Sequence, residues 1–173
     1  MAGRQVARVG GEVVFGERRV VGYTAAQMFG VVADVGRYAE FVPYCRRSAV
    51  TLARGEALAA NLTIGFPPLL HLSYTSHLTL LPPHLVTAVC RDLTLLRHLR
   101  AVWRFTPLPA DASSCEVDFA VSFAFTSAAH QAVARLVLDR VVAENVASFV
   151  RRAGALHGAP SRPPTVPEVV RKQ

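Results

Sequence analysis

From residue 23 to residue 50 the chain reads YTAAQMFGVVADVGRYAEFVPYCRRSAV, and this stretch decides the fold. Residues 24–27, TAAQ, form a capping box: the Thr hydroxyl accepts a hydrogen bond from a free helix N–H, and the Gln side chain reaches back to the cap. The pattern therefore predicts a short helix that Gly36 ends. An aromatic-rich segment follows, and Pro43 prevents it from continuing as regular helix.

Beyond this stretch, apolar residues recur at every second position, as in strands that bury one face. The expected strands lie near 12–22, 46–54, 58–66, 70–80 and 85–91, around Trp103 and Phe105, and at 117–125. About seven such strands predict an antiparallel sheet with one apolar face.

A helical pattern runs from about 128 to 157, with no Pro or Gly before Gly154. At about 1.5 Å per residue, this helix is long enough to cross the whole sheet. The sequence thus predicts an α+β helix-grip fold, in which a curved antiparallel sheet wraps around a long C-terminal helix. Two short helices follow the first strand, and the gap between sheet and helix is a cavity.

Length and composition indicate one domain with basic character. The 173 residues carry a net charge of +7 and are 51% hydrophobic, which suggests hidden apolar surface and attraction to an anionic partner. We expect a flexible N-terminus over 1–11, a domain over 12–158 and a disordered, proline-rich tail over 159–173. Arg4 and Arg8, with no acidic residue before Glu12, fit a transit-peptide remnant and a plain flexible terminus equally.

No transmembrane helix is expected. The segment between Glu56 and Arg91 lacks charged residues, but it alternates and contains Asn61, Pro67 and Pro68. A membrane-spanning helix needs about 20 consecutive apolar residues. The isolated Cys45, Cys90 and Cys115 indicate a reduced compartment rather than disulfides or a zinc site.

Catalytic and metal sites are not predicted. His71 and His77 lie about 20 Å apart on one strand, too far to share a metal ion. Cys45 has no evident base near it in sequence, so a buried structural thiol is the better interpretation. The inward-facing residues of the strands are instead bulky and apolar, as a hydrocarbon ligand would require, at about 0.8 kcal/mol per buried CH₂.

The chain resembles the coenzyme Q-binding family of START-like domains, within the polyketide cyclase/dehydrase superfamily. The first matches are Tyr23, Gln27, Met28, Phe29, 31–35, Tyr38, 41–43, Cys45, Ser48 and Val50. Further matches occur in order at 64–66, 73–77, 91–92, 98–99, 103–107 and 117–119. Tyr44 stands where the family usually has Trp. The resemblance covers residues 23 to about 158 and implies a START/Bet v 1-like fold.

This resemblance also implies a non-enzymatic protein that binds ubiquinone in a hydrophobic tunnel. Its members exchange the lipid with the inner mitochondrial membrane, on the matrix side, and support respiration and efficient ubiquinone synthesis. The expected ligand-binding residues are Tyr38, Phe41, Val42, Pro43, Tyr44, Leu62, Ile64, Phe66, Tyr74, Trp103, Phe119, Phe123, Val137 and Val141.

Polar residues that could donate to the quinone carbonyls are Tyr38, Tyr44, Ser48, Tyr74, Ser76, Arg91 and Trp103. Arg46 and Arg47 are the preferred residues for docking on anionic lipid, at up to about 1 kcal/mol each. The expected partners are ubiquinone or a biosynthetic intermediate, a membrane surface and, as an option, a second copy of the chain. Neither nucleic acid, nor a metal, nor a catalytic cofactor is expected.

Two alternatives stay open. The first is a ribosome-associating regulator of the bacterial toxin type, which the basic charge favours. Scattered arginines without interleaved aromatic residues argue against it. The second is an enzyme of the aromatase/cyclase type, which needs a polar, convergent pocket with a perturbed acid or base.

Overall fold

A curved antiparallel sheet packs against one long helix. The computed structural model describes residues 7–9, 12–66, 70–90 and 96–169. Its strands are β1 (Ala7–Val9), β2 (Glu12–Val21), β3 (Cys45–Arg54), β4 (Ala57–Phe66), β5 (Leu70–Leu81), β6 (Leu85–Cys90), β7 (Leu96–Leu108), β8 (Asp111–Phe125) and β9 (Glu168–Val169). Its helices are α1 (Ala25–Ala33), the 3-10 turn η1 (Val35–Arg37), α2 (Tyr38–Phe41) and α3 (Ala128–His157).

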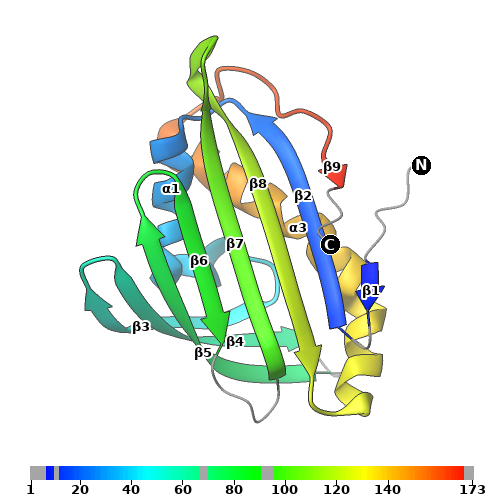
Figure 1. The fold of residues 1–173 in the computed structure, drawn as a ribbon. Helices are drawn as coiled ribbons and strands as arrows, with labels where there is room; N and C mark the ends of the chain where they lie inside the picture. The colour runs from blue at the N-terminus through cyan, green and yellow to red at the C-terminus, as the bar shows by residue number, and fades with distance from the viewer. Residues whose placement is uncertain (1–6, 10–11, 67–69, 91–95, 170–173) are drawn as a thin grey trace.

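The strand order is β1-β2-β8-β7-β6-β5-β4-β3, with β9 paired to β2. In Figure 1, α3 crosses one face of the curved sheet and α1 lies beside it. This is the predicted helix-grip architecture. The seven expected strands correspond to β2–β8, and the two additional strands are short.

The capping box forms as predicted at the start of α1. The Gln27 N–H donates to the Thr24 hydroxyl at 3.1 Å, and the Thr24 N–H donates to the Gln27 side-chain oxygen at 2.9 Å. The end of the helix differs from the prediction, because α1 stops at Ala33 rather than at Gly36. The Asp34 N–H closes the last turn on the Gly30 carbonyl, and the chain tightens into η1.

The C-terminal end of α3 is held by a tyrosine from the start of α1. The Tyr23 hydroxyl donates to the Gly158 carbonyl at 3.0 Å. A Cβ at Gly154 would lie 3.1 Å from the same hydroxyl oxygen, so a glycine there permits the close approach. Gly158 itself has φ +82°, which suits a residue without a side chain after a helix.

The segment after α3 runs along β2, unlike the disordered tail expected from its proline content. The Ser161 N–H donates to the Gly22 carbonyl and the Thr165 N–H to the Val20 carbonyl, both at 2.9 Å. β9 then pairs with residues 17–18 of β2. At the other terminus, β1 pairs with β2 within the segment expected to be flexible.

Candidate functional site

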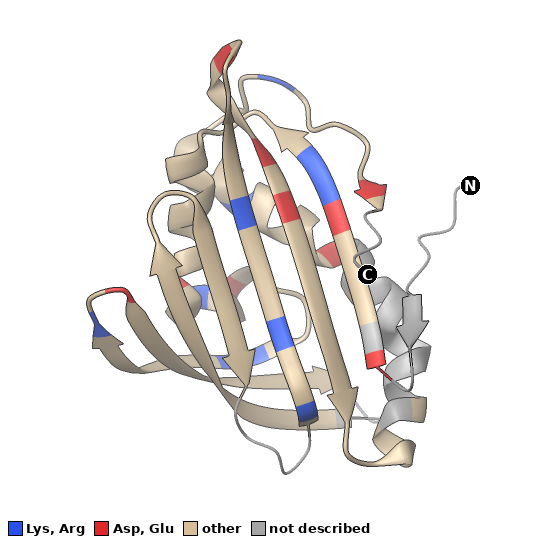
Figure 2. Ribbon diagram, in the orientation of Figure 1, with Lys and Arg blue, Asp and Glu red and all other residues tan. Residues whose placement is uncertain are grey.

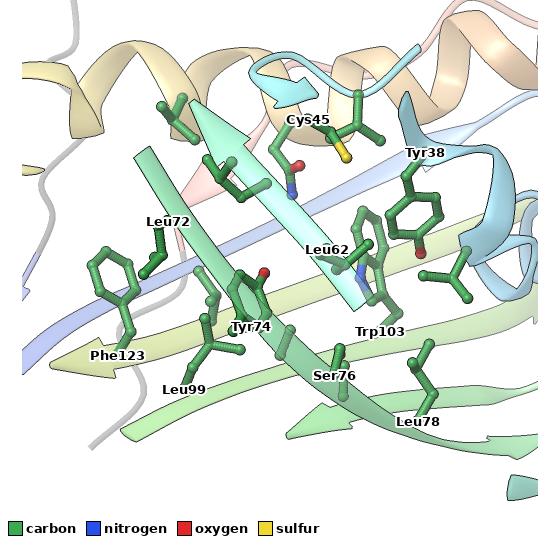
Figure 3. Close-up of a pocket in the computed structure, with 18 of the residues that line it drawn as sticks. Tyr38, Cys45, Leu62, Leu72, Tyr74, Ser76, Leu78, Leu99, Trp103 and Phe123 are labelled. Atoms are coloured by element: carbon green, nitrogen blue, oxygen red, sulfur yellow. The ribbon is translucent and has the colours of Figure 1, made fainter. Parts of the chain in front are cut away.

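A cavity of about 240 Å³ lies between the inner face of the sheet and α3. Its walls come from β4–β8 on one side and from α3 and the η1–α2 segment on the other. Figure 3 shows side chains from these elements converging on a common space. Among the described residues that line it, none carries a charged side chain.

Ten of the fourteen expected ligand-binding residues line this cavity. They are Tyr38, Val42, Pro43, Leu62, Ile64, Tyr74, Trp103, Phe119, Phe123 and Val141. The side chains of Phe66 and Val137 lie outside the part of the chain whose side chains are described. The cavity therefore brings together expected residues from six separate elements, and those on β4, β5, β7 and β8 lie on strand faces that the alternation had predicted to point inward.

Phe41 and Tyr44 are not among the lining residues, in contrast to the expectation. The Phe41 ring packs edge-on against Phe149 with centroids 5.2 Å apart, and the Arg152 guanidinium lies 5.3 Å from its centroid. Tyr44 takes a left-handed φ of +65° and packs against the small cluster around Leu72. Both rings therefore occupy packing positions rather than the cavity lining.

Fourteen lining residues are absent from the expected ligand-binding set, although Ser76 was expected as a possible quinone donor: Val35, Cys45, Leu72, Ser76, Leu78, Val86, Ala88, Leu96, Leu99, Ala101, Val121, Phe125, Asn145 and Phe149. A usable signal existed for some of them. Leu72, Ser76 and Leu78 alternate with Tyr74 along β5, and Asn145 and Phe149 follow Val141 at helical spacing. Small residues such as Ala88 and Ala101 carry no such signal, because their role is to leave space.

Aromatic rings form one wall of the cavity. The Trp103 ring centroid lies 4.3 Å from that of Phe119 and 4.7 Å from that of Phe149. The Tyr38 ring packs edge-on against Phe149 at 5.2 Å. This cluster joins β7, β8, α2 and α3, so it holds the sheet and the helix on either side of the gap.

Some of the cavity's polar groups are already satisfied by the protein. The Tyr38 hydroxyl donates to the Val32 carbonyl at 2.5 Å, and burial raises the pKa of Tyr38 far above its usual range. The Cys45 thiol donates to the Arg47 carbonyl at 3.4 Å, and burial raises its pKa as well. A thiol that stays protonated is a poor nucleophile, which agrees with a structural role for Cys45.

Ser48, one of the expected quinone donors, is not among the residues that line the cavity. The Ser48 hydroxyl donates to the Gly36 carbonyl at 2.8 Å and accepts the Ala39 N–H at 3.0 Å, so it ties β3 to the η1–α2 segment. Arg91 falls outside the described residues.

The described part of the chain contains no group of three or more His, Cys, Asp or Glu side chains arranged to hold a metal ion. Cys45, Cys90 and Cys115 are buried and form no disulfide with one another. No described helix is long and apolar enough to span a membrane. The cavity's chemistry is that of an apolar container with a few hydroxyl, indole and amide groups.

Arg46 and Arg47, the expected docking residues, are exposed on β3 at the edge of the sheet. Neither forms an ion pair with another described residue. The same edge strand carries the exposed aliphatic side chains of Val50 and Leu52. The edge strand β3 therefore carries both cationic and apolar exposed side chains, and its first residues follow Val42 and Pro43 of the cavity lining.

Comparisons with known proteins identify the family. The family model described as polyketide cyclase / dehydrase and lipid transport matches residues 21–150. The coenzyme Q-binding protein COQ10 homolog B, mitochondrial, of Xenopus laevis is 40% identical over 147 residues, covering 84% of this chain and 60% of that protein. The Drosophila melanogaster coenzyme Q-binding protein COQ10, mitochondrial, gives the same identity and coverage. The chain thus spans 60% of the length of these relatives.

A bacterial relative matches over nearly its whole length. The ribosome association toxin RatA of Vibrio cholerae is 31% identical, covering 80% of this chain and 94% of that protein.

Solved structures agree on the architecture. The Zhui aromatase/cyclase from Streptomyces sp. R1128 superposes with a TM-score of 0.72 at 16% identity, covering 86% of this chain and 99% of that one. The 18 kDa protein CC1736 from Caulobacter crescentus gives a TM-score of 0.64 at 27% identity, covering 84% and 99%. The similarity to the Zhui structure shows the fold alone, because the sequence identity is low. The family model and the 40% identical relatives show which family the chain belongs to. This chain belongs to the polyketide cyclase/dehydrase and lipid transport family, and it is 40% identical to two proteins named for coenzyme Q binding.

Proposed function

We propose that this protein binds coenzyme Q in the cavity between the sheet and α3. The observation that carries the proposal is an uncharged, largely apolar cavity in a chain 40% identical to proteins named as coenzyme Q-binding. A polyisoprenoid tail needs apolar surface of this kind, at about 0.8 kcal/mol per buried CH₂. The ligand is ubiquinone or one of its biosynthetic intermediates.

The protein carries the lipid without transforming it. Proton transfer to or from a substrate needs a side chain with a suitable pKa within reach. The tyrosine and cysteine pKa values near the cavity are shifted upward by burial, away from neutrality. We propose that the protein, whose relatives are named as mitochondrial, acts at the matrix side of the inner membrane, where it supports respiration and ubiquinone synthesis.

Delivery of a lipid needs contact with the bilayer. We propose that the β3 edge, defined here as Arg46, Arg47, Val50 and Leu52, docks on anionic membrane. Each arginine near such a surface contributes up to about 1 kcal/mol. The aliphatic side chains, 47% and 45% exposed at Val50 and Leu52, are placed to enter the headgroup region.

Lipid extraction with mass spectrometry tests the binding function. Protein purified from a ubiquinone-containing host, or incubated with ubiquinone liposomes, should carry quinone at close to one molecule per chain. Ala101→Phe should lower this occupancy severalfold, because Ala101 lines the cavity and a ring there occupies the ligand's space. The matched control is Val102→Phe, at the next position of β7 and pointing to the opposite face.

Absence of quinone from the wild type, before and after incubation with liposomes, would remove the proposed function. Equal occupancy in folded Ala101→Phe and Val102→Phe would instead place the ligand outside this cavity.

Ribosome association is a second candidate, because the Vibrio cholerae toxin is matched over 94% of its length. The surface that favours it is the row of Arg97, Arg100 and Arg104, exposed along β7 on the outer face of the sheet. Figure 2 shows acidic residues on the neighbouring strand β8, where Asp118 lies opposite Arg104, and Arg18 of β2 pairs with both Glu116 and Asp118. Co-sedimentation with ribosomal subunits at physiological salt, lost on Arg100→Glu with Arg104→Glu, would support this alternative.

A further inference from the structure

Four polar side chains in the cavity have hydrogen-bonding capacity that the described protein does not use: Tyr74, Ser76 and Trp103 on the sheet, and Asn145 on α3. The Tyr38 hydroxyl and the Cys45 thiol are bonded to backbone carbonyls. In contrast, the Tyr74 hydroxyl and the Asn145 side-chain amide have no hydrogen-bond partner among the described residues, although both line the cavity. A polar group held in an apolar site without a partner is unfavourable, so a ligand that bonds to it gains affinity.

Tyr74 and Asn145 come from opposite walls of the cavity. Tyr74 lies on β5, in register with the lining residue Leu62 of β4. Asn145 lies on α3 between Val141 and Phe149, which both line the cavity. In Figure 3 the Tyr74 and Trp103 side chains point into the cavity from β5 and β7. The Phe149 and Trp103 rings, 4.7 Å apart, give an aromatic surface one helical turn from Asn145.

We propose that Tyr74 and Asn145 form the subsite that binds the ring of the lipid, with each side chain donating a hydrogen bond to a ring carbonyl. This inference rests on the proposed function, and it adds which part of the cavity binds the ring. A quinone ring carries two carbonyl acceptors on opposite edges, which match donors from opposite walls. The uncharged aliphatic remainder of the cavity is left for the isoprenoid tail.

The protonation state of Tyr74 suits a donor. Burial raises the pKa of Tyr74 well above the usual range of a phenol, so its hydroxyl keeps its proton at neutral pH. An amide keeps its two N–H donors at any pH of interest.

The protein contains a single tryptophan, Trp103, which lines the cavity and reports on binding. Ubiquinone with one isoprenoid unit should quench Trp103 fluorescence saturably in the wild type. Tyr74→Phe and Asn145→Leu should each weaken this binding about three- to tenfold, the effect of one lost hydrogen bond. Tyr23→Phe is the matched control, because Tyr23 is not among the residues that line the cavity and its hydroxyl is bonded to the Gly158 carbonyl, so its loss should leave quinone affinity unchanged.

Farnesol, a prenyl alcohol without ring carbonyls, separates hydrogen bonding from shape. In a competition assay, the dissociation constant of farnesol, calculated with each protein's own quinone affinity, should be the same for Tyr74→Phe as for the wild type. The thermal unfolding midpoint of Tyr74→Phe should also match that of the wild type. A variant that loses affinity for quinone and farnesol equally would overturn the subsite, since the effect would then be one of packing.

The failures of the two proposals are distinguishable. If the wild type binds no quinone, the proposed function falls and the subsite falls with it. If the wild type binds quinone and both Tyr74→Phe and Asn145→Leu bind it equally well, only the ring subsite is wrong.

Discussion

Cys115 illustrates how a single buried residue couples stability to pH. It lies on β8 opposite Val21 of β2 and is fully buried. Burial disfavours the thiolate and raises the pKa of Cys115 to about 12, from an ordinary value of 9.0. In the unfolded chain the thiol ionises near its ordinary pKa, whereas in the folded protein it holds its proton to higher pH.

The free energy of unfolding should therefore fall as the pH rises from about 9 to about 12, because the folded state binds the extra proton in that window. Cys115→Val should show a flatter decline than the wild type over the same range. Denaturant unfolding at a series of pH values measures this difference. Parallel pH profiles for the two proteins would contradict the assignment.

At the scale of elements, the packing of β9 and the preceding segment on β2 depends on Gly22. A Cβ at Gly22 would lie 2.5 Å from the backbone nitrogen and oxygen of Arg162, closer than real contacts permit. Backbone atoms cannot swing aside as a flexible side-chain end can, so one of the two segments has to move. Gly22 is thus required where the C-terminal segment packs closely against the end of β2.

We expect Gly22→Ala to release residues 161–169 from β2 and to lower the free energy of unfolding by about 1–3 kcal/mol, as overpacking does. Limited proteolysis should cleave this C-terminal segment faster than in the wild type. Gly30→Ala is the control, because a Cβ there meets nothing within 4 Å. As an exposed helical position it should gain about 0.5–1 kcal/mol of stability. Unchanged proteolysis of Gly22→Ala would show that this close packing tolerates a side chain.

For the whole molecule, membrane docking depends on which edge of the sheet carries arginines that have no ion-pair partner among the described residues. Arg46 and Arg47 lack ion-pair partners among the described residues, whereas Arg37, Arg151 and Arg152 pair with acidic side chains. Paired charges attract an anionic surface less, because the neighbouring carboxylate offsets them. Docking through the β3 edge would bring the Val42–Pro43 side of the cavity close to the bilayer.

Arg46→Glu with Arg47→Glu should weaken binding to anionic liposomes at least tenfold, since reversing two charges removes about 2 kcal/mol of attraction and adds repulsion. Arg97→Glu with Arg100→Glu on β7 changes the net charge equally and should weaken binding far less. Liposome flotation measures both variants, and the effect should shrink at high salt. Equal losses in the two double variants would show that net charge alone drives binding.

The amino-acid sequence by itself determined the helix-grip architecture. The capping box at Thr24, the two-residue alternation along β8 and the length of α3 are local signals, and each depends on residues close together in the chain. Most of the expected cavity residues, such as Leu62, were found in the same way, since alternation tells which face of a strand is inward.

Only the tertiary structure decided where the inner face leaves a cavity and where it packs solid. Trp103 and Phe105 share one face of β7, yet Trp103 lines the cavity while Phe105 packs edge-on against Phe29 of α1. Alternation cannot separate them, because the gap depends on the curvature of the sheet and on side chains from distant segments. For the same reason the packing of Phe41 on Phe149 and the close packing at Gly22 appeared only in three dimensions.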